Sequence, residues 1–170
     1  MARFLVLFCI LQASLFVIEL TPIAQENFVT PFTNLLVLIS VGVISPFDAG
    51  AISNGIYLYD IPSEFAMSIE AGCNAIEASI VLLAAILAFP ATWRSKLVGI
   101  LCGLLSLHVV NILRIVSLFY IGQWDMKIFE WAHLYIWQAL IMLDVFIVFL
   151  FWLRYVIRGG SNTSAFGRAA

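Results

Sequence analysis

The chain has 170 residues, of which 64% are hydrophobic and only 11% charged, and its mean hydropathy is +1.08. This composition excludes a soluble enzyme and indicates one integral membrane domain over residues 1–170, with room for four or five helices of about 20 residues each. A formal net charge of −2 without a basic run argues against a nucleic-acid partner.

Hydropathy predicts an all-α polytopic membrane bundle with four spans, at about residues 4–20, 74–90, 97–121 and 133–155. The apolar stretch 31–46 is marginal in length and predicts an interfacial or re-entrant helix. A five-span alternative, in which this stretch crosses the membrane, stays open. Turn residues within 52–71 predict a short external β-hairpin, and the Gly- and Ser-containing end, 156–170, predicts a flexible tail.

The basic residues predict how the bundle is oriented. Arg94 and Lys96 share the loop 91–96, and Arg154, Arg158 and Arg168 lie at the C-terminal end, whereas the opposite side offers only Lys127 among several acidic residues. The positive-inside rule therefore places the loop and the tail in the cytoplasm. The predicted hairpin and the turn 122–132 then face outward, and both topologies put Cys73 outside.

Arg114 is the most costly residue in the predicted spans, because an arginine near a helix centre costs about 2.5–3.5 kcal/mol even on the lenient insertion scale. It lies seven residues before the end of its predicted span, or roughly 10 Å below the outer surface at about 1.5 Å per residue. Asn111, three residues earlier, shares its face. We expect Arg114 to have a functional role. The alternative is that it forms a structural ion pair with Glu77.

Cys73 precedes an apolar helix, where free backbone N–H groups and the helix dipole favour a thiolate. The negative charge of Glu77, one helical turn later, disfavours a thiolate at Cys73, and the positive charge of a neighbouring Arg114 would cancel this effect. His133 opens the last span in the same outer layer. A thiol, an imidazole and a cation are the groups that cysteine-based acyl transfer requires.

The sequence predicts structural roles for the other titratable groups and thiols. His108 lies about 20 Å below the outer end of its helix by the same rise, and Asp144 lies at a similar depth, which predicts a pair between them. Cys9 and Cys102 are expected to fill space in the interior. No C-x-x-C pair is present, so no metal site is predicted.

Three stretches resemble the cysteine, arginine and histidine blocks of the exosortase/archaeosortase family: Glu70-Ala71-Gly72-Cys73-Asn74, Asn111-Ile112-Leu113-Arg114-Ile115 and Ala132-His133-Leu134. The resemblance covers about residues 56–155 and is closest to the short exosortase H type. Many members carry a serine and a glycine after the cysteine, where this chain has Asn74 and Ala75.

This resemblance implies a cysteine protease or transpeptidase of the bacterial inner membrane whose active site faces the periplasm. Its substrates would be exported proteins with a C-terminal motif of the Ile-Pro-Thr-Leu type, a transmembrane helix and an Arg-rich tail. Cys73 would form a thioester, His133 would be acid and base, and Arg114 would stabilise the oxyanion or the thiolate, with support from Asn74, Glu77 and Asn111. The resemblance implies no metal and no cofactor, and membrane lipid is the only other expected partner.

Two other functions remain compatible with the residues. In a non-catalytic scaffold or assembly subunit, the buried polar residues would only hold the helices together. In a proton or ion carrier, Glu77, His108, Arg114 and Asp144 would form a polar column. The carrier is the weaker alternative, because the chain shows none of the inverted repeats that transporters often have.

Overall fold

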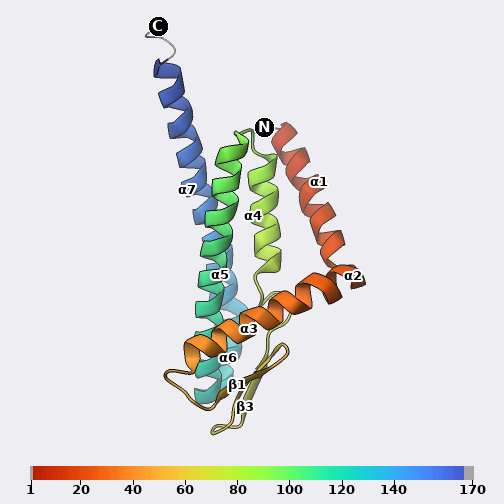
Figure 1. Cartoon of the computed structure of the whole chain (residues 1–170), viewed down its shortest axis with the longest axis vertical. Helices are drawn as coiled ribbons and strands as arrows, with labels where there is room; N and C mark the ends of the chain where they lie inside the picture. The colour runs from red at the N-terminus through yellow and green to blue at the C-terminus, as the bar shows by residue number, and fades with distance from the viewer. Residues whose placement is uncertain (1, 167–170) are drawn as a thin grey trace.

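The computed structural model describes the backbone of residues 2–166 and the side chains of residues 2–158. Four helices stand side by side, namely α1 (Ala2–Glu19), α4 (Ile76–Ala88), α5 (Trp93–Trp124) and α7 (Trp137–Phe166) (Figure 1). The connecting elements are α2 (Pro22–Ala24), the π-helix η1 (Gln25–Val29), α3 (Thr30–Ile44), α6 (Met126–Trp131) and the π-helix η2 (Ala132–Ile136). The predicted all-α polytopic membrane fold is confirmed.

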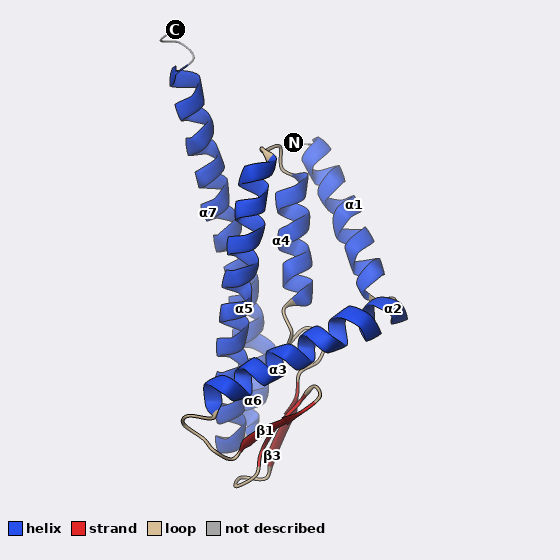
Figure 2. Ribbon diagram, viewed as in Figure 1, coloured by secondary structure: helices blue, strands red, loops and turns tan. Residues whose placement is uncertain are grey.

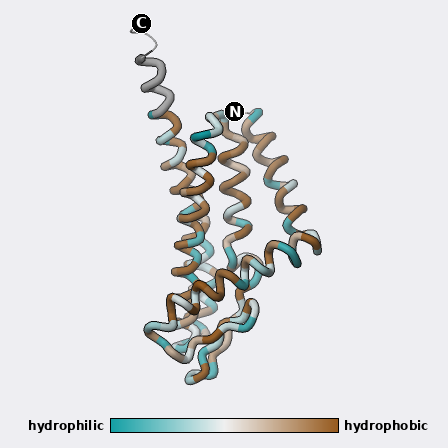
Figure 3. The backbone as a smooth tube through the Cα atoms, in the orientation of Figure 1, coloured by the Kyte–Doolittle hydropathy of each residue, from teal (hydrophilic) through white to brown (hydrophobic). Residues whose placement is uncertain are grey.

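Within the described residues, four helical segments are long and apolar enough to cross a membrane: Ala2–Glu19, Pro22–Ile44, Trp93–Trp124 and Met126–Arg158. Figure 3 shows apolar residues along most of their length. The span predicted at 74–90 is instead the shorter α4, whose 13 residues cover about 20 Å at 1.5 Å per residue. Pro90 ends it, because a proline disfavours the helical conformation of the residue before it, here the extended Phe89.

Helix α3 contains most of the stretch predicted to be interfacial or re-entrant. Figure 1 shows it crossing the upright helices obliquely at the end where the strands lie, far from the N-terminus. Its buried residues Leu36, Val37 and Ile44 pack with Leu58 and Ile69 in one core cluster that also includes residues of α5. The position of α3 relative to a bilayer stays a prediction.

The segment predicted to be an external β-hairpin is a three-stranded antiparallel sheet rather than a two-stranded hairpin (Figure 2). Strands β1 (Ala51–Asn54), β2 (Tyr57–Asp60) and β3 (Phe65–Ser68) follow one another in sheet order. The prediction missed β1 because its last residues, Ser53 and Asn54, precede Gly55, whose φ of +61° makes the first turn.

Phe65 joins this sheet to α5. Its ring centroid lies 6.0 Å from that of Phe119 and 6.2 Å from that of Phe129, and its edge occupies the space where Gly122 lacks a side chain. Because β3 leads directly into residues 69–73, this contact helps to fix where Cys73 lies.

The segment predicted to be a flexible tail, 156–170, continues α7 as a helix to Phe166, and residues 167–170 lie outside the described part of the chain. The segment holds no proline, the residue that most strongly stops a helix.

We expect Gly122→Ala to destabilise the protein by about 1–3 kcal/mol, because the added methyl group would overlap the ring of Phe65. Thermal unfolding in detergent measures this effect. Gly42→Ala is the matched control, since a methyl group there meets nothing within 4 Å and alanine favours a helix by up to about 1 kcal/mol. Equal unfolding temperatures for the two variants would contradict the proposed contact.

Candidate active site

The turn that carries Cys73 is shaped by its backbone and by Glu77. Gly72 has φ of +81° and Ala75 φ of +59°, and a non-glycine residue in this region costs about 1–2 kcal/mol. The Gly72 N–H donates to Glu77 Oε1 at 2.6 Å, and the Cys73 N–H donates to the Glu70 carbonyl at 2.9 Å. Glu77, in the first turn of α4, therefore closes the turn in front of its own helix.

The structure brings together the thiol, imidazole and guanidinium groups that the sequence singled out. Cys73 Sγ lies 2.9 Å from His133 Nε2. Arg114 Nη2 donates to Cys73 Sγ at 3.7 Å, and Arg114 Nη1 donates to the Gly72 carbonyl at 2.9 Å. The three side chains come from the turn before α4, from the C-terminal half of α5 and from η2. Their catalytic role is still a prediction.

His133 lies in a single π-helical turn between α6 and α7. Such turns are rare and occur frequently at functional sites. The ring centroid of Phe129 lies 5.7 Å from that of His133, which limits the movement of the imidazole on one side. Sequence reasoning placed His133 at the start of an ordinary span and had no signal for the wider turn.

Arg114 is only 2% exposed, yet it does not form the ion pair that was the alternative explanation for it. Its terminal nitrogens point to Gly72 and Cys73, while the Glu77 carboxylate accepts from the backbone and acts on Arg114 only through its charge. Arg114 Nε and both amide atoms of Asn111 are buried without a hydrogen-bond partner in the described part of the chain. A buried polar group without a hydrogen-bond partner costs about 1–3 kcal/mol, so these atoms of Arg114 and Asn111 lower the stability of the fold.

Asn74 ties the cysteine turn to α3. It is buried, and its Nδ2 donates to Thr33 Oγ1 at 3.1 Å, while its Oδ1 accepts from the Ile76 N–H at 3.1 Å. The Asn74 side chain therefore accepts the first N–H of α4 and also forms a hydrogen bond with Thr33, 41 positions earlier. The sequence pointed to Asn74, but it gave no indication that Thr33 was its partner, because Thr33 reads only as one polar residue within an apolar stretch.

Burial raises the pKa of the Cys73 thiol above its ordinary value, and the nearby Arg114 charge offsets part of that rise. The expected activation by a helix N-terminus is wrong, because α4 begins only at Ile76 and leaves Cys73 three residues outside it. The resting thiol is therefore protonated near neutral pH. A protonated thiol needs a base in order to act as a nucleophile, and His133 Nε2 lies within reach of Cys73 Sγ.

Two other sequence predictions are wrong. His108 and Asp144 are not paired: Asp144 accepts a 3.5 Å hydrogen bond from Ser106, and the His108 ring packs edge-on against Phe32 at 5.0 Å. Cys9 and Cys102 are exposed on the helix surfaces rather than buried in the interior. Helix periodicity could not distinguish these faces, because apolar residues occur on every face of these helices.

A family model described as transmembrane exosortase (Exosortase_EpsH) matches residues 2–153, a range that includes all three reactive side chains. The chain belongs to the exosortase family. Searches of curated proteins and of solved structures each found no match. Family membership and the apolar helices together show a transmembrane exosortase-family protein.

We expect alkylation of Cys73 by iodoacetamide to show an apparent pKa above that of free cysteine, because burial disfavours the thiolate. Arg114→Gln should raise this pKa further, since it removes the charge that opposes the effect of burial. The measurement uses a Cys9→Ser, Cys102→Ser background in nanodiscs, and the same chain unfolded in detergent is the control. Rapid alkylation at pH 6 would contradict a protonated resting thiol.

Proposed function

We propose that this exosortase-family protein is a membrane-embedded cysteine transpeptidase or protease that cleaves the C-terminal sorting signal of exported proteins through a thioester on Cys73. The observation that supports it most is the 2.9 Å contact between Cys73 Sγ and His133 Nε2, residues 60 positions apart, with Arg114 Nη2 3.7 Å from the same sulfur. A nucleophile, a base and a cation converge on one atom, as acyl transfer requires.

The first half of the reaction follows from this contact. His133 Nε2 accepts the thiol proton as Sγ attacks the carbonyl carbon of the scissile peptide bond, so the proton of neutral His133 starts on Nδ1. The guanidinium of Arg114 stabilises the negative charge that develops on sulfur and on the carbonyl oxygen. The C–N bond then breaks, and His133 returns the proton to the leaving amine. The fragment with the transmembrane helix and tail departs.

The second half releases the exported protein from Cys73. A water molecule or an amine attacks the thioester carbonyl, with His133 accepting its proton, and the sulfur leaves and recovers a proton from His133. Attack by water gives hydrolysis, and attack by an amine gives transfer to an acceptor. The same imidazole serves as base and acid in both halves.

We place the site at the periplasmic face of the bacterial inner membrane. Figure 1 shows the N-terminus and the connection between α4 and α5 at one end, and the sheet at the other. Arg94 and Lys96 lie at the first of these ends, where Lys96 Nζ donates to the Leu87 carbonyl. The positive-inside rule assigns that end to the cytoplasm, which leaves Cys73 and the sheet on the other side.

Co-expression with a reporter tests the proposal. The reporter is an exported domain followed by an Ile-Pro-Thr-Leu motif, a transmembrane helix and an Arg-rich tail, and an immunoblot follows removal of the tail. We expect Cys73→Ala to abolish processing and His133→Ala to slow it by about 10²–10⁴-fold, the usual contribution of a general base. Cys102→Ala is the matched control and should process normally. Processing by Cys73→Ala at the wild-type rate would disprove the proposal.

The carrier alternative makes the opposite prediction for the deeper polar residues. Because Asp144 bonds Ser106 and His108 packs against Phe32, we expect His108→Ala and Asp144→Asn to process the reporter within about twofold of wild type, as substitutions outside a reaction centre usually do. Initial rates in the same assay measure this. Loss of processing in both variants would contradict the proposed site, and absence of processing by the wild-type protein would favour the carrier.

A further inference from the structure

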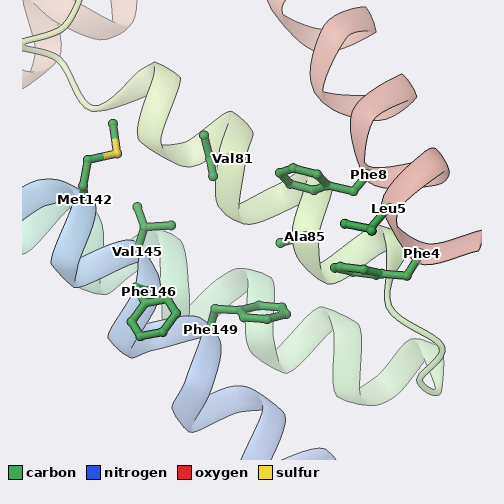
Figure 4. Close-up of a pocket in the computed structure, with 9 residues that line it drawn as sticks. All are labelled: Phe4, Leu5, Phe8, Val81, Ala85, Met142, Val145, Phe146 and Phe149. Carbon is green, nitrogen blue, oxygen red and sulfur yellow. The ribbon is translucent and has the colours of Figure 1, made fainter. Parts of the chain in front are cut away.

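An apolar groove lies between α1, α4 and α7 and encloses about 320 Å³. Its floor is formed by Val81 and Ala85 of α4, with Phe4 and Phe8 of α1 on one side and Phe146 and Phe149 of α7 on the other (Figure 4). Every residue that lines it is apolar. The groove belongs to the membrane-spanning part of the chain, so whatever occupies it comes from within the bilayer.

The floor of this groove leads to the cysteine. On α4 the half-buried positions Ala85, Val81 and Glu77 recur every four residues, and residues 78–80, 82 and 84 beside them are buried. Residues four apart lie on one face of a helix. Cys73, which is also half-buried, lies three residues before α4 begins. The stripe from Ala85 to Glu77 therefore leads from the groove toward the turn that carries the thiol.

The two helices beside the groove also position the reactive pair. Cys73 precedes α4, and His133 lies in the π-helical turn that leads into α7. A rod lying along the groove parallel to α4 would thus have one end directly below the Cys73–His133 contact. The small side chain of Ala85 on the floor allows a helix backbone to approach closely, which is how helices associate in membranes.

We propose that this groove binds the transmembrane helix of the substrate and guides the peptide bond before it to Cys73, an inference that rests on the proposed function. Ala85 lies nine residues after Ile76, so the groove floor is about 14 Å from the start of α4. A substrate helix whose outer end reaches the thiol would therefore run beside the groove for about two and a half turns. After cleavage the same helix, carried by the leaving fragment, can diffuse away sideways into lipid.

Disulfide crosslinking tests this placement. Ala85→Cys is introduced into a chain with Cys73→Ala, Cys9→Ser and Cys102→Ser, and single cysteines are moved along the transmembrane helix of the reporter. We expect oxidation to form crosslinks at reporter positions three to four residues apart, about tenfold more strongly than from Leu97→Cys. Leu97 is the matched control: it lies four residues inside α5, as Ala85 lies three inside α4, and it is 57% exposed.

A processing assay gives a second, independent readout. In the otherwise unchanged protein, Ala85→Trp fills the groove and should slow processing at limiting reporter by about tenfold, whereas Leu97→Trp should not slow it. Ala85→Leu, a smaller change, should give an intermediate rate. The folding of each variant is checked by its unfolding temperature in detergent.

The outcomes separate this proposal from the one on which it rests. If Cys73→Ala still processes the reporter, the proposed function fails, whatever the crosslinks show. If Cys73→Ala is inactive but Ala85→Cys crosslinks no better than Leu97→Cys, the groove proposal is wrong and the proposed function stands. Slower processing by Ala85→Trp without any crosslink to the reporter would indicate a lipid chain in the groove and would also overturn the proposal.

Discussion

Arg114 carries a charge that the fold buries almost completely, at 2% exposure, inside a helix of membrane-spanning length. Such a charge needs partners from the protein, because lipid supplies none. The partners here are the Gly72 carbonyl and the Cys73 sulfur. The cysteine turn must therefore lie over α5 at this depth, so the position of the thiol is fixed by the need to compensate the arginine.

Three further contacts keep the turn that carries Cys73 in place. Glu77 closes it through the Gly72 N–H, Asn74 ties it to Thr33 of α3, and Phe65 ties the preceding strand to α5. Each contact joins segments that are distant in the sequence or closes a turn that local preferences disfavour. Together they hold Cys73 Sγ at 2.9 Å from His133 Nε2.

Hydropathy and depth counting predicted the membrane class of the fold and found Cys73, Arg114 and His133, because an ionisable residue in an apolar helix stands out against its surroundings. The same reasoning paired His108 with Asp144 and expected Glu77 to pair with Arg114 if the arginine were structural, and both contacts are absent among the described side chains. The partner of a buried polar group depends on how helices rotate and tilt on docking. A one-dimensional pattern holds no information on that rotation, and for the same reason Thr33 and the Gly72 carbonyl could not be found.

The length of α4 has a consequence for the chemistry. Its 13 residues cover about 20 Å, whereas the hydrocarbon core is about 30 Å thick. If its Phe89 end lies at the inner boundary, the start of α4 lies about 10 Å inside the outer one, and Cys73, three residues earlier, lies closer to that boundary. Helix α5 begins at Trp93, beside that inner end, and Arg114 lies 21 residues or about 31 Å further along it, so its backbone is close to the outer boundary. Burial by protein keeps water scarce around Arg114, so this cation acts more strongly on developing charge than it would in water. In the proposed reaction, a peptide bond next to a membrane helix would approach Cys73 from within the bilayer, and so the side of the site that faces lipid would matter more than the side that faces solvent.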